Sequence, residues 1–240
     1  MHTHKTVTGK KKFRFTQDTV FDIIVAAILS IIILIMAYPI YFVLMASFSD
    51  PSYVNNGSML LWPKGFTLLG YQKVFEDSRI WTGYGNTLIY TIGGTALGTF
   101  FTMMAGYALS RRDLPFRNLL MAYFVFTMYF GGGLVPYYMV LKGIHMLNTF
   151  WVFIFPLMMS VYNMILVRSY VESMPESLFE AAKIDGATDL TVFFRLVLPL
   201  AKPILMTIGL FVAVNQWNSF QDTLLLVTDT KLYPLQFILY

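Results

Sequence analysis

Cysteine is absent from this sequence, which excludes disulfides and thiolate metal sites. The three histidines, His2, His4 and His145, are too few and too scattered to form a metal site. Charged residues are also scarce at 12% of the chain, about half the fraction that a soluble domain carries. We therefore expect neither a soluble domain, nor a metal site, nor a cofactor.

Apolar residues make up 57% of the chain and gather in five stretches that contain no Asp, Glu, Lys or Arg. These stretches hold between 19 and 31 residues each, and they are 23–49, 80–110, 118–141, 143–167 and 203–221. A helix of about 20 apolar residues crosses a bilayer, so each stretch can form one span. The first is too long for a signal-peptide core and is interpreted as a retained helix. The sequence thus predicts an all-α, polytopic membrane protein with five visible spans.

The positions of lysine and arginine predict the orientation of these spans. Such residues accumulate in cytoplasmic segments. With the N-terminus inside, 12 of the 17 basic residues fall on the cytoplasmic side. Residues 1–20 then form a basic cytoplasmic tail, and residues 21–240 form the membrane domain. The chain would end outside, in the polar-to-apolar run 234–240, so we expect a sixth span in the full chain, missing from this sequence.

The spans are predicted at 21–47, 82–109, 118–141, 147–168 and 203–221. The third is interrupted by three consecutive glycines, Gly131 to Gly133, and then by Pro136. Broken backbone at membrane depth requires protein or a water-filled cavity around it, so this break would line or close a path. Alternatively, the helix simply ends there and the chain re-enters as a loop.

The cytoplasmic loop 169–202 is the longest connection between predicted spans on that side, and it has the pattern of a structured segment. Ser173 and Glu176 fit a capping box that begins a short helix at 178–184, and Gly186 can end that helix. A second amphipathic run follows, with an apolar face at i, i+3, i+4 and i+7 formed by Leu190, Phe193, Phe194 and Val197. Pro199 and Pro203 then turn the chain back into the membrane.

The loop sequence Glu180-Ala-Ala-Lys-Ile-Asp-Gly-Ala187, followed by Phe194 and Leu198-Pro199, resembles the EAA loop of binding-protein-dependent ABC permeases. Other segments are similar to the carbohydrate branch of that family, the MalG-like and LplC-like permeases. They are Phe130-Gly-Gly-Gly-Leu-Val-Pro136, Leu147-Asn-Thr149, Gln216-Trp-Asn-Ser219 and Leu232-Tyr-Pro-Leu-Gln236.

The resemblance implies a type I ABC importer permease in the bacterial plasma membrane. Its partners would be a second permease, two ATP-binding cassette ATPase subunits and an extracytoplasmic solute-binding lipoprotein. The EAA helix would be a coupling helix in a cleft of the ATPase, and the residues implied in coupling are Phe179, Glu180, Ala181, Ala182, Asp185 and Gly186. The chain has no P-loop of the type G-x-x-x-x-G-K-[ST], so a partner would hydrolyse ATP and this chain would not be an enzyme.

Polar residues inside the predicted spans are candidates for the translocation path. They are Asn86, Tyr90, Tyr129, Asn163, Asn215, Trp217 and Asn218. Aromatic and amide side chains together suit sugars, whose faces stack and whose hydroxyls form hydrogen bonds. The same side chains can also join helices to one another.

An ion-coupled secondary transporter is the main alternative function. Such proteins place ionisable groups within their spans, whereas the five stretches here contain no acidic or basic residue. A membrane scaffold without transport is a second alternative, but it needs neither a structured cytoplasmic loop nor a broken third span.

Overall fold

The computed structural model describes residues 17–240, and its regular elements in that range are all helical. Most of the expected basic tail, residues 1–20, lies outside the described residues. The chain divides into two compact units, Met1–Glu76 and Asp77–Tyr240. Two helices are long and apolar enough to cross a membrane, and up to five spans result if each bent pair of helices counts as one. The all-α membrane fold is confirmed, with an approximate number of spans.

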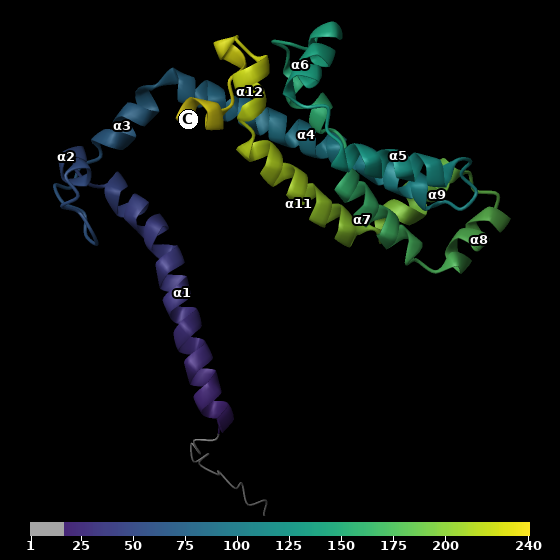
Figure 1. The fold of residues 1–240 in the computed structure, drawn as a ribbon, viewed down its shortest axis with the longest axis horizontal. Coiled ribbons are helices and arrows are strands. Elements are labelled where there is room, and N and C mark those ends of the chain that lie inside the picture. The colour runs from purple at the N-terminus through teal and green to yellow at the C-terminus, as the bar shows by residue number, and fades with distance from the viewer. Residues whose placement is uncertain (1–16) are drawn as a thin grey trace, which may run out of the picture. The chain divides into compact units, whose positions relative to one another are not determined.

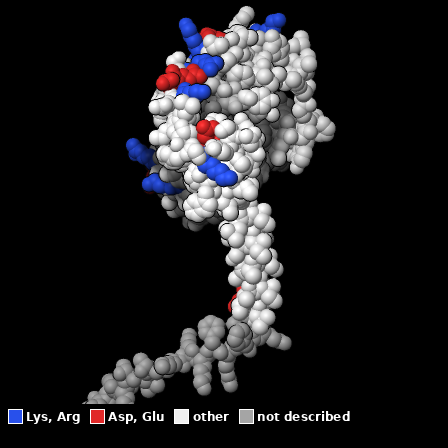
Figure 2. Space-filling view, turned by 90° about the vertical axis from the view of Figure 1, so that its left-hand side faces the viewer, with Lys and Arg blue, Asp and Glu red and all other residues white. Residues whose placement is uncertain are grey.

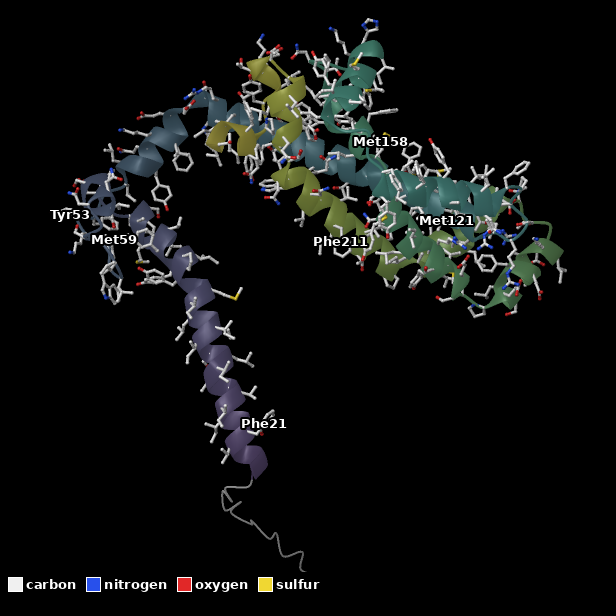
Figure 3. All side chains as sticks on the ribbon, in the orientation of Figure 1. Phe21, Tyr53, Met59, Met121, Met158 and Phe211 are labelled. Carbon is white, nitrogen blue, oxygen red and sulfur yellow. The ribbon has the colours of Figure 1, made fainter. Side chains whose placement is uncertain are left out.

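The first unit contains one long apolar helix, α1 (Gln17–Ser47), followed by two short helices, α2 (Pro51–Asn55) and α3 (Leu69–Glu76). Figure 2 shows the surface of α1 as uncharged over most of its length. Its apolar side chains project outward, as Phe21 does in Figure 3. At about 1.5 Å per residue, 31 residues extend about 46 Å, which exceeds the hydrocarbon thickness of a bilayer.

The second unit is built around α4 (Ser78–Ser110), which packs along α7 (Val161–Glu172) and α11 (Lys202–Asn218) (Figure 1). Glycines of α4 face both neighbours. A Cβ atom added at Gly106 would lie 2.5 Å from Cγ1 of Val167 on α7. A Cβ atom at Gly94 would overlap the side-chain amide of Gln216 on α11. The small glycines thus let α4 approach both neighbours closely.

The predicted third span is broken into α5 (Arg117–Tyr129) and α6 (Leu134–Gly143), which meet at an angle of 118°. Gly133 has φ 82°, a conformation that L-residues with a Cβ rarely adopt. The 13 residues of α5 extend only about 20 Å, less than a bilayer core. The predicted interruption is thus confirmed as a change of direction.

The continuous helix predicted at 147–168 is wrong. The chain forms two short 3₁₀ turns, η1 (Phe150–Phe153) and η2 (Phe155–Leu157), before α7 begins at Val161. Pro156 donates no backbone hydrogen bond, and the Ser160 hydroxyl caps α7 by accepting from the Asn163 N–H at 3.4 Å. The apolar composition predicted a span in this segment but not the two places where its backbone changes.

The predicted short helix of the loop is present as α8 (Glu176–Ile184), but the capping box is wrong. Ser173 instead ends α7, and its hydroxyl donates to the Tyr170 carbonyl at 2.6 Å. Pro175 occupies the N-cap position without a side-chain bond. The predicted end at Gly186 is confirmed, because this residue has φ 73° and the following N–H, of Ala187, bonds the Ala182 carbonyl at 2.9 Å.

The second amphipathic run of the loop forms α9 (Asp189–Val192), the π-helical turn η3 (Phe193–Val197) and α10 (Leu198–Leu200). The predicted apolar face is partly wrong, since Leu190 and Phe194 are 62% and 50% exposed. The buried face instead runs across the junction between α9 and the π turn. The buried side chains are Val192, Phe193 and Val197. The predicted turn into the last span is confirmed by an 82° bend before α11.

The C-terminal segment returns along the first half of α4. It comprises α12 (Gln221–Leu226), the 3₁₀ turn η4 (Thr230–Leu232) and α13 (Leu235–Leu239). Three side chains of α4 bind its backbone. Asn86 donates to the carbonyls of Lys231 and Tyr233, Tyr90 donates to the carbonyl of Leu232, and Thr87 accepts from the N–H of Leu235.

Candidate functional site

Helix α8 lies at one end of the bundle, beside α9 (Figure 1), and has an inner and an outer face. On the inner face, Phe179 and Ala182 are half-buried and pack on a core cluster that includes Met103 of α4 and Val167 of α7. Ala187, just beyond the helix, contacts the same cluster. These contacts fix the helix against the inner ends of its neighbours.

The outer face of α8 is open to contact. Glu180 and Ala181 are exposed, as are Asp185 and Gly186 at the end of the helix. Ile184 lies on the same side and is 86% exposed, the largest exposed fraction among the large hydrophobic side chains described. The six residues suggested by the resemblance therefore divide into two that pack internally and four that remain free to meet another protein.

A charged cavity of about 440 Å³ lies between α8, α7 and the connection from α4 to α5. Arg168 Nε lies 2.9 Å from Glu172 Oε1, and Arg117 also pairs with Glu172. Lys183 Nζ lies 3.2 Å from Asp113 Oδ2. The hydrogen bond from Lys183 lowers the pKa of the Asp113 carboxyl. This pair therefore contributes to stability at neutral pH, and the contribution is lost only as the pH falls below the ordinary carboxyl value of about 4.

A second cavity, of about 720 Å³, lies between the segment 156–163 and α11. We call it the amide groove because its lining includes Asn163, Asn215, Asn218 and Gln216. Phe211, labelled in Figure 3, also lines it. The structure thus brings three predicted path residues together. Gln216 was missed as a path candidate, although it belongs to the Gln216–Ser219 segment that carried the resemblance.

The other predicted path residues lie elsewhere. Asn86 and Tyr90 hold the C-terminal segment, and the Tyr90 ring stacks on Phe153 with centroids 4.3 Å apart. Trp217 packs edge-on against Tyr84, and Tyr129 is 74% exposed at the end of α5. Within this chain, the contacts of Asn86 and Tyr90 are those of side chains that join helices.

Asn148 clamps the loop that follows α12. Its Oδ1 accepts from the N–H groups of Thr228 and Asp229 at 2.5 and 3.2 Å, and its Nδ2 donates to the Thr228 hydroxyl at 2.8 Å. The backbone of Asn148 has φ 56°, which asparagine tolerates better than most residues. One residue therefore supplies both the turn and the clamp.

Asn148→Ala is expected to lower the free energy of unfolding by about 2 kcal/mol, because it removes several hydrogen bonds worth about 1 kcal/mol each and strains the turn. Asn148→Gly keeps the positive φ and should lose only the side-chain contribution. Thermal unfolding of the detergent-solubilised chain would measure both. Equal midpoints for Asn148→Ala and the unmodified chain would contradict the clamp.

Comparisons with known proteins agree with this architecture. Residues 9–232 match the family model described as "Binding-protein-dependent transport system inner membrane component". The chain is 35% identical to Protein LplC of Bacillus subtilis over all of its length and 78% of that protein. It is 36% identical to the polygalacturonan/rhamnogalacturonan transport system permease protein YtcP of the same organism, over 93% of this chain and 78% of YtcP.

A solved structure has the same fold. It is the crystal structure of a bacterial ABC transporter involved in the import of the acidic polysaccharide alginate. The TM-score is 0.87 at 32% identity, and the match covers 95% of this chain and 82% of the other. Together with the family match, this shows that the chain belongs to the binding-protein-dependent transport system inner membrane components, the permeases of ABC importers.

Proposed function

We propose that this permease forms part of the translocation path for a sugar or oligosaccharide. An external binding protein delivers the solute, and two cytosolic ATPase subunits drive its passage. The observation that carries this proposal is the division of α8 into a packed inner face and an exposed outer face. A helix fixed to the bundle on one side and open on the other can transmit the movement of a docked ATPase to the spans.

The coupling residues have distinct roles in this proposal. Phe179 and Ala182 hold α8 on the bundle, whereas Glu180, Ala181, Asp185 and Gly186 face the ATPase. The chain has no P-loop, so ATP binds the partner and this chain needs no cofactor. The chain itself is not an enzyme, in keeping with relatives that are transport permeases.

The charge distribution supports a cytoplasmic position for α8 and for the N-terminus. The two connections predicted to be cytoplasmic, 110–117 and 169–202, meet at one end of the bundle through ion pairs such as Lys183–Asp113. Lysine and arginine in short loops favour the cytoplasmic side. In this orientation the opposite end, with the C-terminal segment and its Asn148 clamp, faces the binding protein.

The amide groove is the proposed solute surface of this subunit. Asn163, Asn215 and Asn218 supply donors and acceptors for hydroxyl groups, and Phe211 supplies an apolar ring. The carbohydrate class is supported by relatives with named solutes, including the polygalacturonan/rhamnogalacturonan permease YtcP and an arabinooligosaccharide permease, AraQ. A second permease subunit would complete the path.

Purification from native membranes in mild detergent tests the assembly. We expect a P-loop ATPase, a second permease and a solute-binding lipoprotein to copurify with this chain. Uptake by the reconstituted complex is then measured with labelled galacturonan, arabinan and alginate oligosaccharides. Vanadate should stop uptake and a protonophore should not. Recovery without any ATPase, or uptake that only a protonophore stops, would indicate a secondary transporter instead.

A further inference from the structure

The Arg111 side chain lies close to residues of α4, α8 and α9 and of the connection after α4. It occupies the C-cap position of α4, and its side chain is only 16% exposed. The guanidinium carbon lies 5.5 Å from the centre of the Phe179 ring on α8 and 6.0 Å from that of Tyr107 on α4. Its nitrogens lie 3.5 Å from Asp113 Oδ1 and 3.9 Å from Asp189 Oδ1. We call these five residues the Arg111 cluster.

The geometry points to Arg111 as a positioning residue for coupling. We propose that it fixes α8 and α9 to the inner end of α4, so that the three helices move as one body when the ATPases close. This inference rests on the proposed function, and it concerns contacts within the chain that are separate from the ATPase-facing residues. Asp113 extends the cluster, because one of its oxygens lies within ion-pair distance of Arg111 and the other accepts a hydrogen bond from Lys183 of α8.

The burial of the arginine itself, rather than of its partners, distinguishes Arg111 from the other basic residues that pair near α8, because Asp113 and Asp189 are 58% and 74% exposed. The Lys183–Asp113 pair has both side chains 58% exposed, and the Arg112–Glu176 pair is 81% and 66% exposed. Ion pairs between two exposed side chains contribute little to stability, because solvent and salt screen them and ordering two long side chains costs entropy. A largely buried guanidinium between two rings and two carboxylates has few alternative positions. The planar group also cannot be reproduced by lysine, which lacks the flat face and the fork of donors.

The absence of cysteine allows a direct measurement of this rigid-body movement. Ser177 on α8 and Phe101 on α4 are both exposed and lie outside the cluster, so cysteines at these positions can carry spin labels. The distance between the two spin labels is measured by pulsed EPR in the copurified importer, first without nucleotide and then after trapping with ATP and vanadate. We expect one narrow distance distribution that is the same in both states.

Arg111→Ala and Arg111→Lys should both broaden this distribution. They should also lower transport per ATP hydrolysed by about fivefold or more, at unchanged amounts of assembled complex. A residue with a merely structural role would lower transport and ATP hydrolysis together. If Arg111→Ala fails to assemble, Phe179→Leu removes one ring face of the cluster, leaves the arginine in place and should broaden the distribution similarly.

Arg112→Ala is the matched control, because Arg112 is the next residue and also pairs with α8, but through an exposed contact. It should change neither the distance nor the ratio of transport to ATP hydrolysis. Equal effects of the two alanine variants would overturn the proposal, as would a shift of several ångströms between nucleotide states in the parent chain. A parent chain that binds no ATPase would instead contradict the proposed function, and the inference with it.

Discussion

Gly106→Ala is expected to lower the free energy of unfolding by about 1–3 kcal/mol, the usual cost of overpacking a close-packed core. The added Cβ would lie 2.5 Å from Val167 Cγ1, 2.7 Å from Val167 Cβ and 3.1 Å from the Met164 carbonyl oxygen. A β-branched side chain and a backbone atom cannot move aside as a flexible side chain does, so α4 and α7 must separate. The thermal midpoint of the solubilised chain and the yield of assembled importer would both fall.

Gly85→Ala provides the control for this prediction. It makes the same change in the same helix, where a Cβ would meet no atom within 4 Å beyond the adjoining residues and backbone of its own helix. Alanine is favoured over glycine inside a helix by about 1 kcal/mol, so this variant should be neutral or more stable. A midpoint for Gly106→Ala equal to that of Gly85→Ala would show that the α4–α7 contact is looser than described.

Glu180→Lys is expected to abolish coupling while leaving the chain inserted and folded. Glu180 is exposed on α8 and makes no ion pair among the described residues. Reversing its charge therefore leaves the described ion pairs of this chain intact. In the proposed ATPase cleft, loss of a desolvated charge contact costs about 2 kcal/mol or more, which weakens docking about 30-fold. Copurified ATPase and solute uptake should both fall.

Glu76→Lys is the matched control, since it reverses an exposed carboxylate in the loop predicted to lie outside the membrane. Both variants should be found in the membrane in equal amounts. Only Glu180→Lys should lose ATPase, and normal uptake by that variant would remove Glu180 from the mechanism.

The sequence predicted well those features that depend on one residue or on overall composition. Long apolar stretches predicted the membrane helices, three glycines predicted the break between α5 and α6, and Gly186 ended α8 where expected. Each follows from a local rule. Backbone N–H and C=O groups must be hydrogen-bonded within lipid, and a backbone position with positive φ favours glycine.

The errors arose where two local rules competed. Ser173 and Glu176 fit a capping box, but the chain continues α7 up to Ser173 and leaves Pro175 to begin α8. The apolar face predicted from Leu190 to Val197 assumed an uninterrupted α-helical period, and the π turn interrupts that period. Apolar composition alone also could not distinguish the two 3₁₀ turns between Phe150 and Leu157 from a continuous helix.

The candidate site was predicted in part. The resemblance identified α8, but only the structure separates Phe179 and Ala182, which pack inward, from the exposed residues. Arg111 was not singled out, because a single arginine next to a predicted span is explained by topology alone. Its role depends on contacts with residues up to 78 positions away, such as Asp189, and local sequence carries no signal for these.

The π turn at Phe193–Val197 also sets the angular phase between the coupling segment and the last span. Its closing bond runs from the Leu198 N–H to the Phe193 carbonyl, five residues back. Relative to an α-helix, the turn accommodates one extra residue, which in an α-helix would add about 100° of rotation and 1.5 Å of rise. Deleting one residue within the turn would restore α-helical bonding and leave α9 and α11 in nearly the same orientation. If the residue stayed and the π turn were lost, α9 would rotate about its axis relative to α11, and with it the direction in which α8 presents its outer face.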